Sequence, residues 1–303
     1  MSDKVTIVEV GPRDGLQNEK QSIDAATKIQ LINRLSAAGL VHIEAGAFVS
    51  PKWVPQMAGS ADVLKAVLPE NGRKLWVLVP NLRGFEDAAA AGAQHVAVFT
   101  AASESFSQKN TNASIAESLA RIAEVTTAAK ARNIPVRGYV SCALGCPFEG
   151  DIAPGAVTKV TEELFRLGCV EVSIGDTIGT GTIASTRALF SQLARSFAPT
   201  TLAAHFHDTY GQALANLTVA FEHGVRVVDS SVGGLGGCPY APGATGNVAT
   251  EDVVRFCEGQ GMATGVDSAK LAATGTWIST ALNRANASRA GKALCSKTPS
   301  CGA

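Results

Sequence analysis

The chain has 303 residues, of which 46 % are hydrophobic and 17 % are charged, a composition typical of a globular protein with a large core and not of a disordered one. Its 26 lysines and arginines balance 26 acidic residues, so no net charge attracts nucleic acid or an anionic membrane surface. No apolar run reaches the ~20 residues of a spanning helix, and we expect neither nucleic acid nor a membrane as a partner.

Eight short runs, most of them rich in β-branched residues, predict strands along the chain. They cover residues 5–10, 41–44, 75–79, 95–99, 135–140, 170–174, 202–205 and 225–228. Between them lie segments with apolar residues at helical spacing, such as Ile29, Ile32 and Leu35 after the first strand. Several of these segments end in a glycine shortly before the next strand, which indicates a left-handed helix stop and a tight connection. These glycines are Gly39, Gly92, Gly168 and Gly224.

The alternation of strand and helix predicts an α/β protein, a single parallel (β/α)₈ or TIM barrel with a C-terminal helical extension. An open doubly wound sheet is the alternative, but eight units of similar length favour a closed barrel. We expect the catalytic barrel over residues 1–263. Residues 264–303 hold one helical pattern, around 271–282, and then a polar tail expected to pack on the barrel.

In a barrel of this kind, the groups that follow the carboxyl ends of the strands converge at one end, here called the mouth. Polar groups occur at several of these positions. The seventh strand leads into His205 and His207, which lie two residues apart, so their side chains share one face of an extended segment. This is a metal-ligand spacing, although two histidines on a strand are equally often structural.

A mixed ligand set at the mouth favours a hard divalent cation. The carboxylate of Asp14, the amide oxygen of Asn247 and the two imidazoles of His205 and His207 would offer nitrogen and oxygen ligands with room for water. Such a set suits Mg²⁺ or Mn²⁺, and zinc is the second choice because a structural zinc site is closed and rich in sulfur. Asn247 has an alternative role as an N-cap, since it precedes a helical pattern.

Three further residues suggest acid, base and oxyanion chemistry. The simplest interpretation of Arg13 is a surface ion pair with its neighbour Asp14. The alternative is that Glu44, at the end of the second strand, fixes the guanidinium and leaves its other donors for an oxyanion. Cys238 lies among glycines, which favours either a buried thiol or a proton donor and acceptor on a hinged loop. Asp176 and Asp208 are expected to cap helices or orient ligands.

The other cysteines and histidines are assigned structural roles. Cys142 and Cys146 lack the second pair that a zinc set requires, and His42, His95 and His223 have no partner by spacing. Seven cysteines without a small-domain disulfide framework favour the cytoplasm. Cys295 and Cys301, in the tail, are expected as free thiols, with pairing between chains as the alternative. Neither a dinucleotide fingerprint nor a phosphate-binding P-loop occurs in the sequence.

Five motifs of the chain resemble those of the 3-hydroxy-3-methylglutaryl-CoA lyases, metal-dependent TIM barrels that break Claisen-type bonds. The motifs are residues 11–20 (GPRDGLQNEK), 48–57 (FVSPKWVPQM), 137–147 (RGYVSCALGCP), 205–216 (HFHDTYGQALAN) and 231–240 (SVGGLGGCPY). The cysteine-containing motif is the most specific of them. The resemblance covers nearly the whole chain and leaves only the residues after about Arg284 unplaced.

The resemblance implies a function and a set of site residues. The reaction would be the cleavage of 3-hydroxy-3-methylglutaryl-CoA, an acyl-CoA, to acetyl-CoA and acetoacetate with Mg²⁺ or Mn²⁺, as in leucine degradation. We also expect a homodimer. The metal ligands would be Asp14, His205, His207 and Asn247. The catalytic residues would be Arg13, Glu44, His205 and Cys238, and Arg13 and Gln17 are expected to bind substrate.

One departure from the family pattern keeps alternatives open. The family pattern is Glu-x-x-Ser-Phe, and this chain has alanine at position 47 in place of the serine. The missing hydroxyl leaves the preference among acyl groups open. A lyase for a longer 3-hydroxy-3-alkylglutaryl-CoA, or a related condensing enzyme, is therefore the second hypothesis. A metal-binding barrel without catalysis is the third, but it would not need Arg13, Glu44 and Cys238 together.

Overall fold

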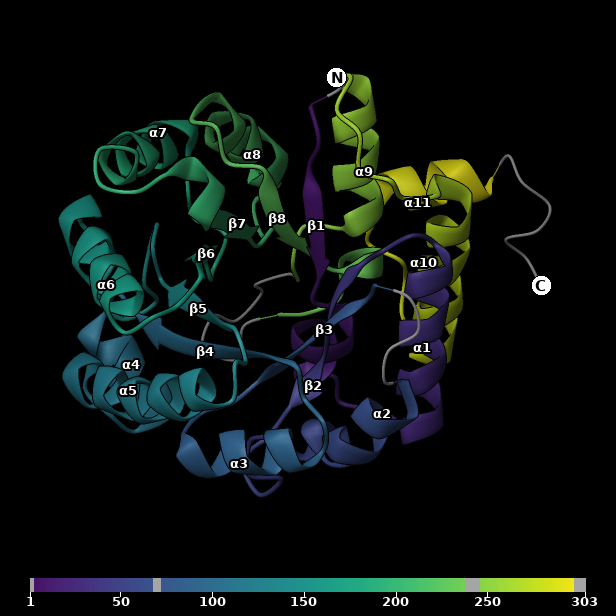
Figure 1. Cartoon of the computed structure of the whole chain (residues 1–303). Coiled ribbons are helices and arrows are strands. Elements are labelled where there is room, and N and C mark those ends of the chain that lie inside the picture. The colour runs from purple at the N-terminus through teal and green to yellow at the C-terminus, as the bar shows by residue number, and fades with distance from the viewer. Residues whose placement is uncertain (1–2, 68–71, 238–245, 297–303) are drawn as a thin grey trace.

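The computed structural model describes residues 3–67, 72–237 and 246–296. Eight parallel strands close into a barrel in chain order, each paired with the next and the last with the first. Figure 1 shows the helices arranged around these strands. The strands are β1 (Thr6–Glu9), β2 (His42–Ala47), β3 (Lys74–Leu78), β4 (His95–Ala101), β5 (Val136–Ser141), β6 (Glu171–Asp176), β7 (Leu202–Phe206) and β8 (Val227–Ser230). The prediction of a TIM barrel is confirmed, and the open sheet is excluded.

The described helices follow the predicted alternation. They are α1 (Ala25–Ala37), α2 (Ser60–Val67), α3 (Leu82–Ala90), α4 (Glu104–Thr111), α5 (Ile115–Ala131), α6 (Pro154–Arg166), α7 (Ile183–Leu193), α8 (Ala213–Glu222), α9 (Thr250–Gly259), α10 (Ser268–Ala281) and α11 (Arg289–Cys295). The four glycines expected to stop helices, at positions 39, 92, 168 and 224, all have positive φ, between 87° and 103°. Because only glycine adopts this conformation at low cost, the chain can turn there into the next strand.

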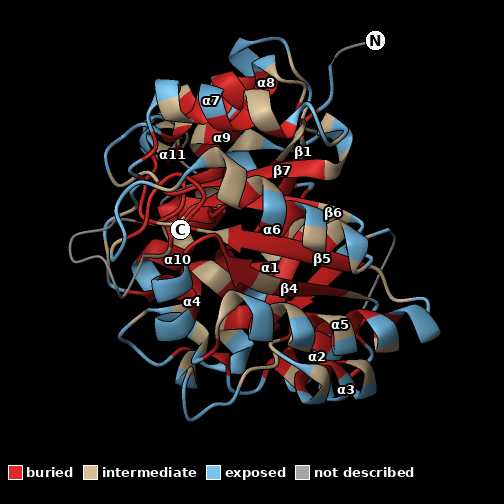
Figure 2. Cartoon of the chain, turned by 90° about the vertical axis from the view of Figure 1, so that its left-hand side faces the viewer, coloured by how far each residue is buried: buried red, intermediate tan, exposed pale blue. Residues whose placement is uncertain are grey.

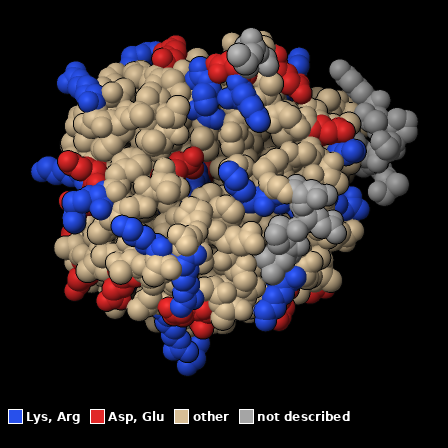
Figure 3. Space-filling view, in the orientation of Figure 1, with Lys and Arg blue, Asp and Glu red and all other residues tan. Residues whose placement is uncertain are grey.

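The core lies between the strands and the inner faces of the helices. Figure 2 shows buried residues along the strands and exposed residues on the outer faces of the helices. Fully buried side chains such as Ile43, Val140 and Ile174 come from the strands, whereas Leu31, Leu35 and Leu164 come from the helices. Figure 3 shows lysine and arginine scattered among acidic residues over one face. Among the described residues, no helix is both long and apolar enough to cross a bilayer.

Several strands run further toward the mouth than the sequence pattern predicted. The second strand does not end at Glu44 but continues through Ala47, with a register shift between Glu44 and Gly46 against β3. The residues added, Ala-Gly-Ala, have weak strand propensity, and the pairing with β3 overrides it. Such a shift marks a β-bulge or another irregularity of the pairing, and these features change side-chain directions at the rims of barrels. Glu44 therefore lies inside the strand and is fully buried.

The C-terminal extension contains more structure than one helix and a tail. Helix α10 packs against α1, and a second helix, α11, packs against α9 and α10. Figure 1 shows these helices together on one side of the barrel. The expectation of an unstructured polar tail directly after α10 is therefore wrong for residues 289–295. Cys295 is disulfide-bonded, which corrects the expectation of a free thiol there, and Cys301 lies outside the described residues.

A buried carboxylate where α9 meets the barrel predicts how stability depends on pH. Burial raises the pKa of Glu251 from 4.5 to about 8, against the opposing effect of backbone amides. The folded state thus favours the protonated carboxyl of Glu251. Its contribution to the free energy of unfolding is complete below the unfolded pKa and is lost as pH rises through the folded pKa. We expect the Tm to fall between about pH 5 and about pH 9.

Replacing the titrating group tests this pH dependence. In Glu251→Gln the side chain cannot ionise, so its Tm should fall less steeply with pH than that of the wild type. Thermal unfolding followed by circular dichroism at a series of pH values measures both slopes. The exposed Glu162→Gln serves as the control and should keep the wild-type slope. Equal slopes for the wild type and Glu251→Gln would assign the pH dependence to other groups.

Candidate active site

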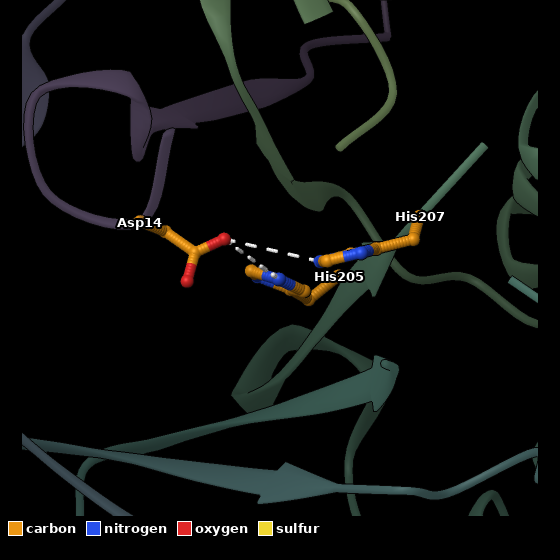
Figure 4. A group of neighbouring side chains, drawn as sticks. All are labelled: Asp14, His205 and His207. Carbon is orange, nitrogen blue, oxygen red and sulfur yellow. Dashed lines mark ion pairs between the residues drawn. The ribbon is translucent and has the colours of Figure 1, made fainter. Parts of the chain in front are cut away.

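A carboxylate and two imidazoles converge at the mouth of the barrel. Asp14 comes from η1 (Gly11–Gly15), the short helical turn after β1, and His205 and His207 come from β7 and the residue that follows it. The Oδ2 atom of Asp14 lies 4.0 Å from Nε2 of His205 and 3.8 Å from Nε2 of His207. Figure 4 shows the three side chains pointing toward one another. One ligand atom from each lies within 4.8 Å of the others, as the His-x-His spacing predicted.

Asn247 lies beside this group. Its backbone forms an antiparallel bridge with His207, and its Nδ2 donates to Oδ2 of Asp14 at 2.7 Å. Its Oδ1 atom is buried and has no hydrogen-bond partner among the described residues. Since the N-cap of α9 is Ala249, the interpretation of Asn247 as a helix cap is wrong.

The donors at this position fit a divalent cation. Rotating the Asn247 amide by half a turn would present its unpartnered oxygen where the Asp14 carboxylate and the two imidazoles meet. Burial acts to raise the pKa of Asp14, but Arg13 and the two histidines lower it to about 2. The carboxylate is therefore ionised at neutral pH, as a metal ligand must be. Oxygen and imidazole ligands together suit Mg²⁺ or Mn²⁺.

The guanidinium of Arg13 is held beside the same group. Its Nε donates to Oε2 of Glu44 at 2.7 Å, and its Nη1 donates to Oδ1 of Asp14 at 2.7 Å. Burial disfavours the cation, but the carboxylates of Glu44 and Asp14 raise the pKa of Arg13 above its usual value. Two of its three nitrogens are thus engaged, and the remaining N–H groups of this buried cation can face a substrate oxygen. The expected fixing of Arg13 by Glu44 is present in the structure.

Sequence reasoning missed the residue that orients His205. Nδ1 of His205 lies 3.0 Å from Oδ2 of Asp229, a fully buried residue of β8 that pairs with His205 in the barrel register. Asp229 also accepts two hydrogen bonds from Arg137, at 2.6 and 3.0 Å, and one from Ser173 at 2.7 Å. With Asp229 ionised, the proton of His205 lies on Nδ1, and the lone pair of Nε2 faces Asp14. A charged residue within an apolar strand, such as Arg137, was the signal available in the sequence.

Removing the charge of Asp229 should weaken the site without altering its ligands. In Asp229→Asn, the amide can offer His205 either a donor or an acceptor, so the tautomer with a free Nε2 is no longer enforced. We expect a loss of ~10–100-fold in Mn²⁺ affinity, the usual range for partners of metal ligands. Titration calorimetry of Mn²⁺ checks this. A wild-type affinity in Asp229→Asn would show that His205 keeps its orientation by other means.

The remaining predicted residues fall into three groups. Cys238 lies outside the described residues. Gln17 lies two residues after the end of η1 and is half-buried. Asp208 accepts from the backbone N–H of Ala213, the first residue of α8, and Asp176 accepts from that of Gly181, in the connection between β6 and α7.

The cysteines and histidines assigned structural roles lie where packing explains them. Cys142 and Cys146 are buried and are not disulfide-bonded. The ring nitrogens of His223 lie 3.0 Å from Oγ of Ser191 and 2.8 Å from the carbonyl oxygen of Val219. His42 Nδ1 lies 3.4 Å from Nε1 of Trp76. These contacts agree with the structural roles that spacing suggested.

Comparison with known proteins agrees with this geometry. A family model described as HMGL-like matches residues 4–278. A relative from Pseudomonas aeruginosa, named 3-hydroxy-3-isohexenylglutaryl-CoA/hydroxy-methylglutaryl-CoA lyase, is 56 % identical over 294 residues, which are 97 % of this chain and 98 % of the relative.

Solved structures give the same result. The crystal structure of hydroxymethylglutaryl-CoA lyase from Pseudomonas aeruginosa superposes with a TM-score of 0.95 at 55 % identity, covering 98 % of this chain and 99 % of that one. An HMG-CoA lyase from Acinetobacter baumannii in complex with coenzyme A and 3-methylmalate has a TM-score of 0.93 at 35 % identity, over 97 % and 96 % of the two chains. This chain therefore belongs to the HMGL-like family of lyases, the family that its motifs predicted.

Proposed function

We propose that this chain cleaves 3-hydroxy-3-methylglutaryl-CoA to acetyl-CoA and acetoacetate in a reaction that requires a divalent metal, Mg²⁺ or Mn²⁺. One observation carries the proposal. Arg13, fixed by Glu44, lies directly beside the group formed by Asp14, His205 and His207. A cation-binding group next to a buried guanidinium is what the bond cleavage requires, because negative charge moves from the hydroxyl to the thioester.

The reaction has three chemical requirements. The proton leaves the hydroxyl on C3, the C2–C3 bond breaks to form a ketone, and C2 of the resulting thioester enolate takes up a proton. A divalent cation held by Asp14, His205, His207 and Asn247 would supply Lewis-acid activation of the hydroxyl. Arg13 would stabilise the enolate oxygen with its free N–H groups.

We assign proton transfer to His205 and Cys238. The hydrogen bond from His205 to Asp229 fixes the imidazole with Nε2 toward the mouth. A thiol such as that of Cys238 can take up the hydroxyl proton and return it to C2, and the imidazole of His205 can do so only while its Nε2 is not bound to the cation. Glu44 is fully buried and bonded to Arg13, so it acts by holding the guanidinium. Gln17, half-buried after η1, is proposed to contact the acyl-CoA.

A lyase for a longer 3-hydroxy-3-alkylglutaryl-CoA is the second candidate function, and two observations favour it. The relative from Pseudomonas aeruginosa is named for both an isohexenyl and a methyl substrate. In this chain Ala47, the last residue of β2, stands where the family pattern has serine and is fully buried. A smaller side chain near the acyl path would leave room for a longer substituent.

One assay separates these functions. The purified chain with Mn²⁺ is given 3-hydroxy-3-methylglutaryl-CoA or its isohexenyl analogue, and acetyl-CoA release and the keto acid formed are measured. We expect acetoacetate from the methyl substrate, and cleavage of both substrates would support the broader function. Asp14→Ala serves as the control for contaminating activity. Tight Mn²⁺ binding without cleavage of either substrate would favour the non-catalytic metal-binding barrel.

We further propose a homodimer, a cytoplasmic location and a boundary near residue 263 between the barrel and its extension. The buried cysteines at positions 142, 146, 169 and 257 are not disulfide-bonded, as in a reducing compartment, whereas the disulfide of Cys295 in the C-terminal extension points the other way. Burial raises the pKa of Cys169 to about 12 and that of Cys257 to about 11, so both thiols are unreactive at neutral pH. Sedimentation equilibrium tests the homodimer, cell fractionation tests the location, and limited proteolysis tests the boundary near residue 263.

A further inference from the structure

Glu9 is a buried carboxylate beneath the candidate metal site that the chemistry above does not use. It is the last residue of β1 and is fully buried. Its Oε1 accepts the backbone N–H of Gly11 at 2.8 Å and that of Val232 at 2.9 Å. Its Oε2 accepts the hydroxyl of Thr250 at 2.6 Å. A single carboxylate thus joins three segments that are far apart in the sequence.

Each of these segments bears or adjoins a candidate ligand. Gly11 opens η1, which carries Arg13 and Asp14. Val232 opens η4 (Val232–Gly234), and the carbonyl of Leu235 just beyond it accepts both the backbone N–H and the side-chain amide of Asn247, each at 3.3 Å. Thr250 begins α9, three residues after Asn247. Glu9 therefore holds the segment of Asp14 against the segments that position Asn247.

The space around Glu9 is too tight for another arrangement. A Cβ atom on Gly11 would lie 2.5 Å from Oε1 of Glu9, and one on Gly15 would lie 2.8 Å from Cβ of Leu235. Real Cβ atoms essentially never approach other heavy atoms this closely, so glycine at positions 11 and 15 allows the close packing of η1 against Glu9 and Leu235. The carboxylate fills the remaining polar space between the two turns.

The far side of η4 is fixed independently by the C-terminal part of the chain. The N–H of Gly233 donates to both oxygens of Glu251, at 2.9 and 3.1 Å, and its carbonyl accepts the N–H of Ala287 at 3.0 Å. The turn is thereby anchored to α9 and to the segment between α10 and α11. Against this anchored turn, the bonds of Glu9 set the position of η1.

We propose that Glu9 is a positioning residue for metal binding: by joining η1 to η4 and α9, it sets the separation of Asp14 from Asn247 and thereby the metal affinity. The inference rests on the proposed metal site. Without the carboxylate, the N–H groups of Gly11 and Val232 lose their common acceptor, and the two turns are free to separate. Ligands held loosely bind a cation less tightly, as with other partners of metal ligands.

The test compares three substitutions by the dissociation constant of Mn²⁺, measured on the free protein by electron paramagnetic resonance. Glu9→Ala removes the acceptor and should weaken binding ~10-fold or more, within the range for supporting residues. Glu9→Gln keeps one oxygen for the two amides and a polar group for Thr250, so it should bind Mn²⁺ nearly as the wild type does. If Glu9→Ala does not fold, Glu9→Asp replaces it. This substitution withdraws the carboxylate by one methylene and should also weaken binding.

A matched control separates positioning from stability. Val125→Ala, in α5, removes fully buried volume away from the mouth and should lower the Tm while leaving Mn²⁺ affinity unchanged. Wild-type Mn²⁺ affinity in Glu9→Ala and Glu9→Asp would overturn the inference and leave the proposed function intact. An equal loss of Mn²⁺ affinity in Val125→Ala would also overturn the inference, because the loss would then follow from reduced stability. If Asp14→Ala bound Mn²⁺ as tightly as the wild type, the proposed metal site itself would be wrong.

Discussion

Removing the divalent metal should abolish cleavage of 3-hydroxy-3-methylglutaryl-CoA, and adding Mg²⁺ or Mn²⁺ should restore it. Without the cation, Asp14 and the two histidines have no Lewis acid to hold, and the substrate hydroxyl keeps its high pKa. The measurement is acetoacetate formation after dialysis against a chelator, followed by titration with each metal. Full activity in a preparation verified to be metal-free would contradict the metal-dependent mechanism.

Single ligands can be tested in the same way. His207→Ala removes one imidazole from the group at the mouth and should weaken Mn²⁺ binding strongly. His223→Ala serves as the control, because His223 lies at the end of α8 and contacts Ser191. Mn²⁺ titration of both variants by calorimetry gives the comparison. If His207→Ala bound Mn²⁺ as tightly as His223→Ala, His207 would leave the ligand set.

Arg13→Met should lower kcat by ~10²–10³-fold or more, which is the usual cost of removing one oxyanion donor. Methionine keeps much of the side-chain volume but removes the charge that faces the developing enolate. It also leaves Glu44 and Asp14 without the guanidinium that each contacts at 2.7 Å. Because the enolate charge exists only after the bond begins to break, the loss should appear in kcat rather than in KM.

Steady-state kinetics and an independent metal titration separate the roles open to Arg13. Arg34→Met is the matched control. Arg34, on the outer helix α1, lies over the ring of Trp277 in α10, so its replacement should leave kcat unchanged. Mn²⁺ affinity of Arg13→Met should stay within a few-fold of the wild type, because Arg13 is not a ligand. A rise in KM at constant kcat would instead make Arg13 a substrate clamp.

Local features of the sequence were sufficient to predict the barrel. Most strands appear as β-branched runs, although β7 (Leu202–Phe206) contains none. Glycines such as Gly39 and Gly168 mark where helices stop, because backbone conformation depends on neighbouring residues. The same local logic identified His205 and His207, whose shared face follows from the alternation of an extended chain. The expected convergence of these histidines with Asp14 required only that strand ends meet at one mouth.

The partners of these residues were decided by tertiary structure alone. Arg13, in η1, meets Glu44 of β2, which lies at a register shift against β3. His205 meets Asp229 because the closed register places β8 beside β7. Glu9 contacts Val232 and Thr250, which lie more than 220 residues away. Hydrophobic periodicity records which side of an element is buried, but it does not record which distant side chain lies opposite. That choice depends on register, bulges and turn geometry, which exist only once the barrel has closed.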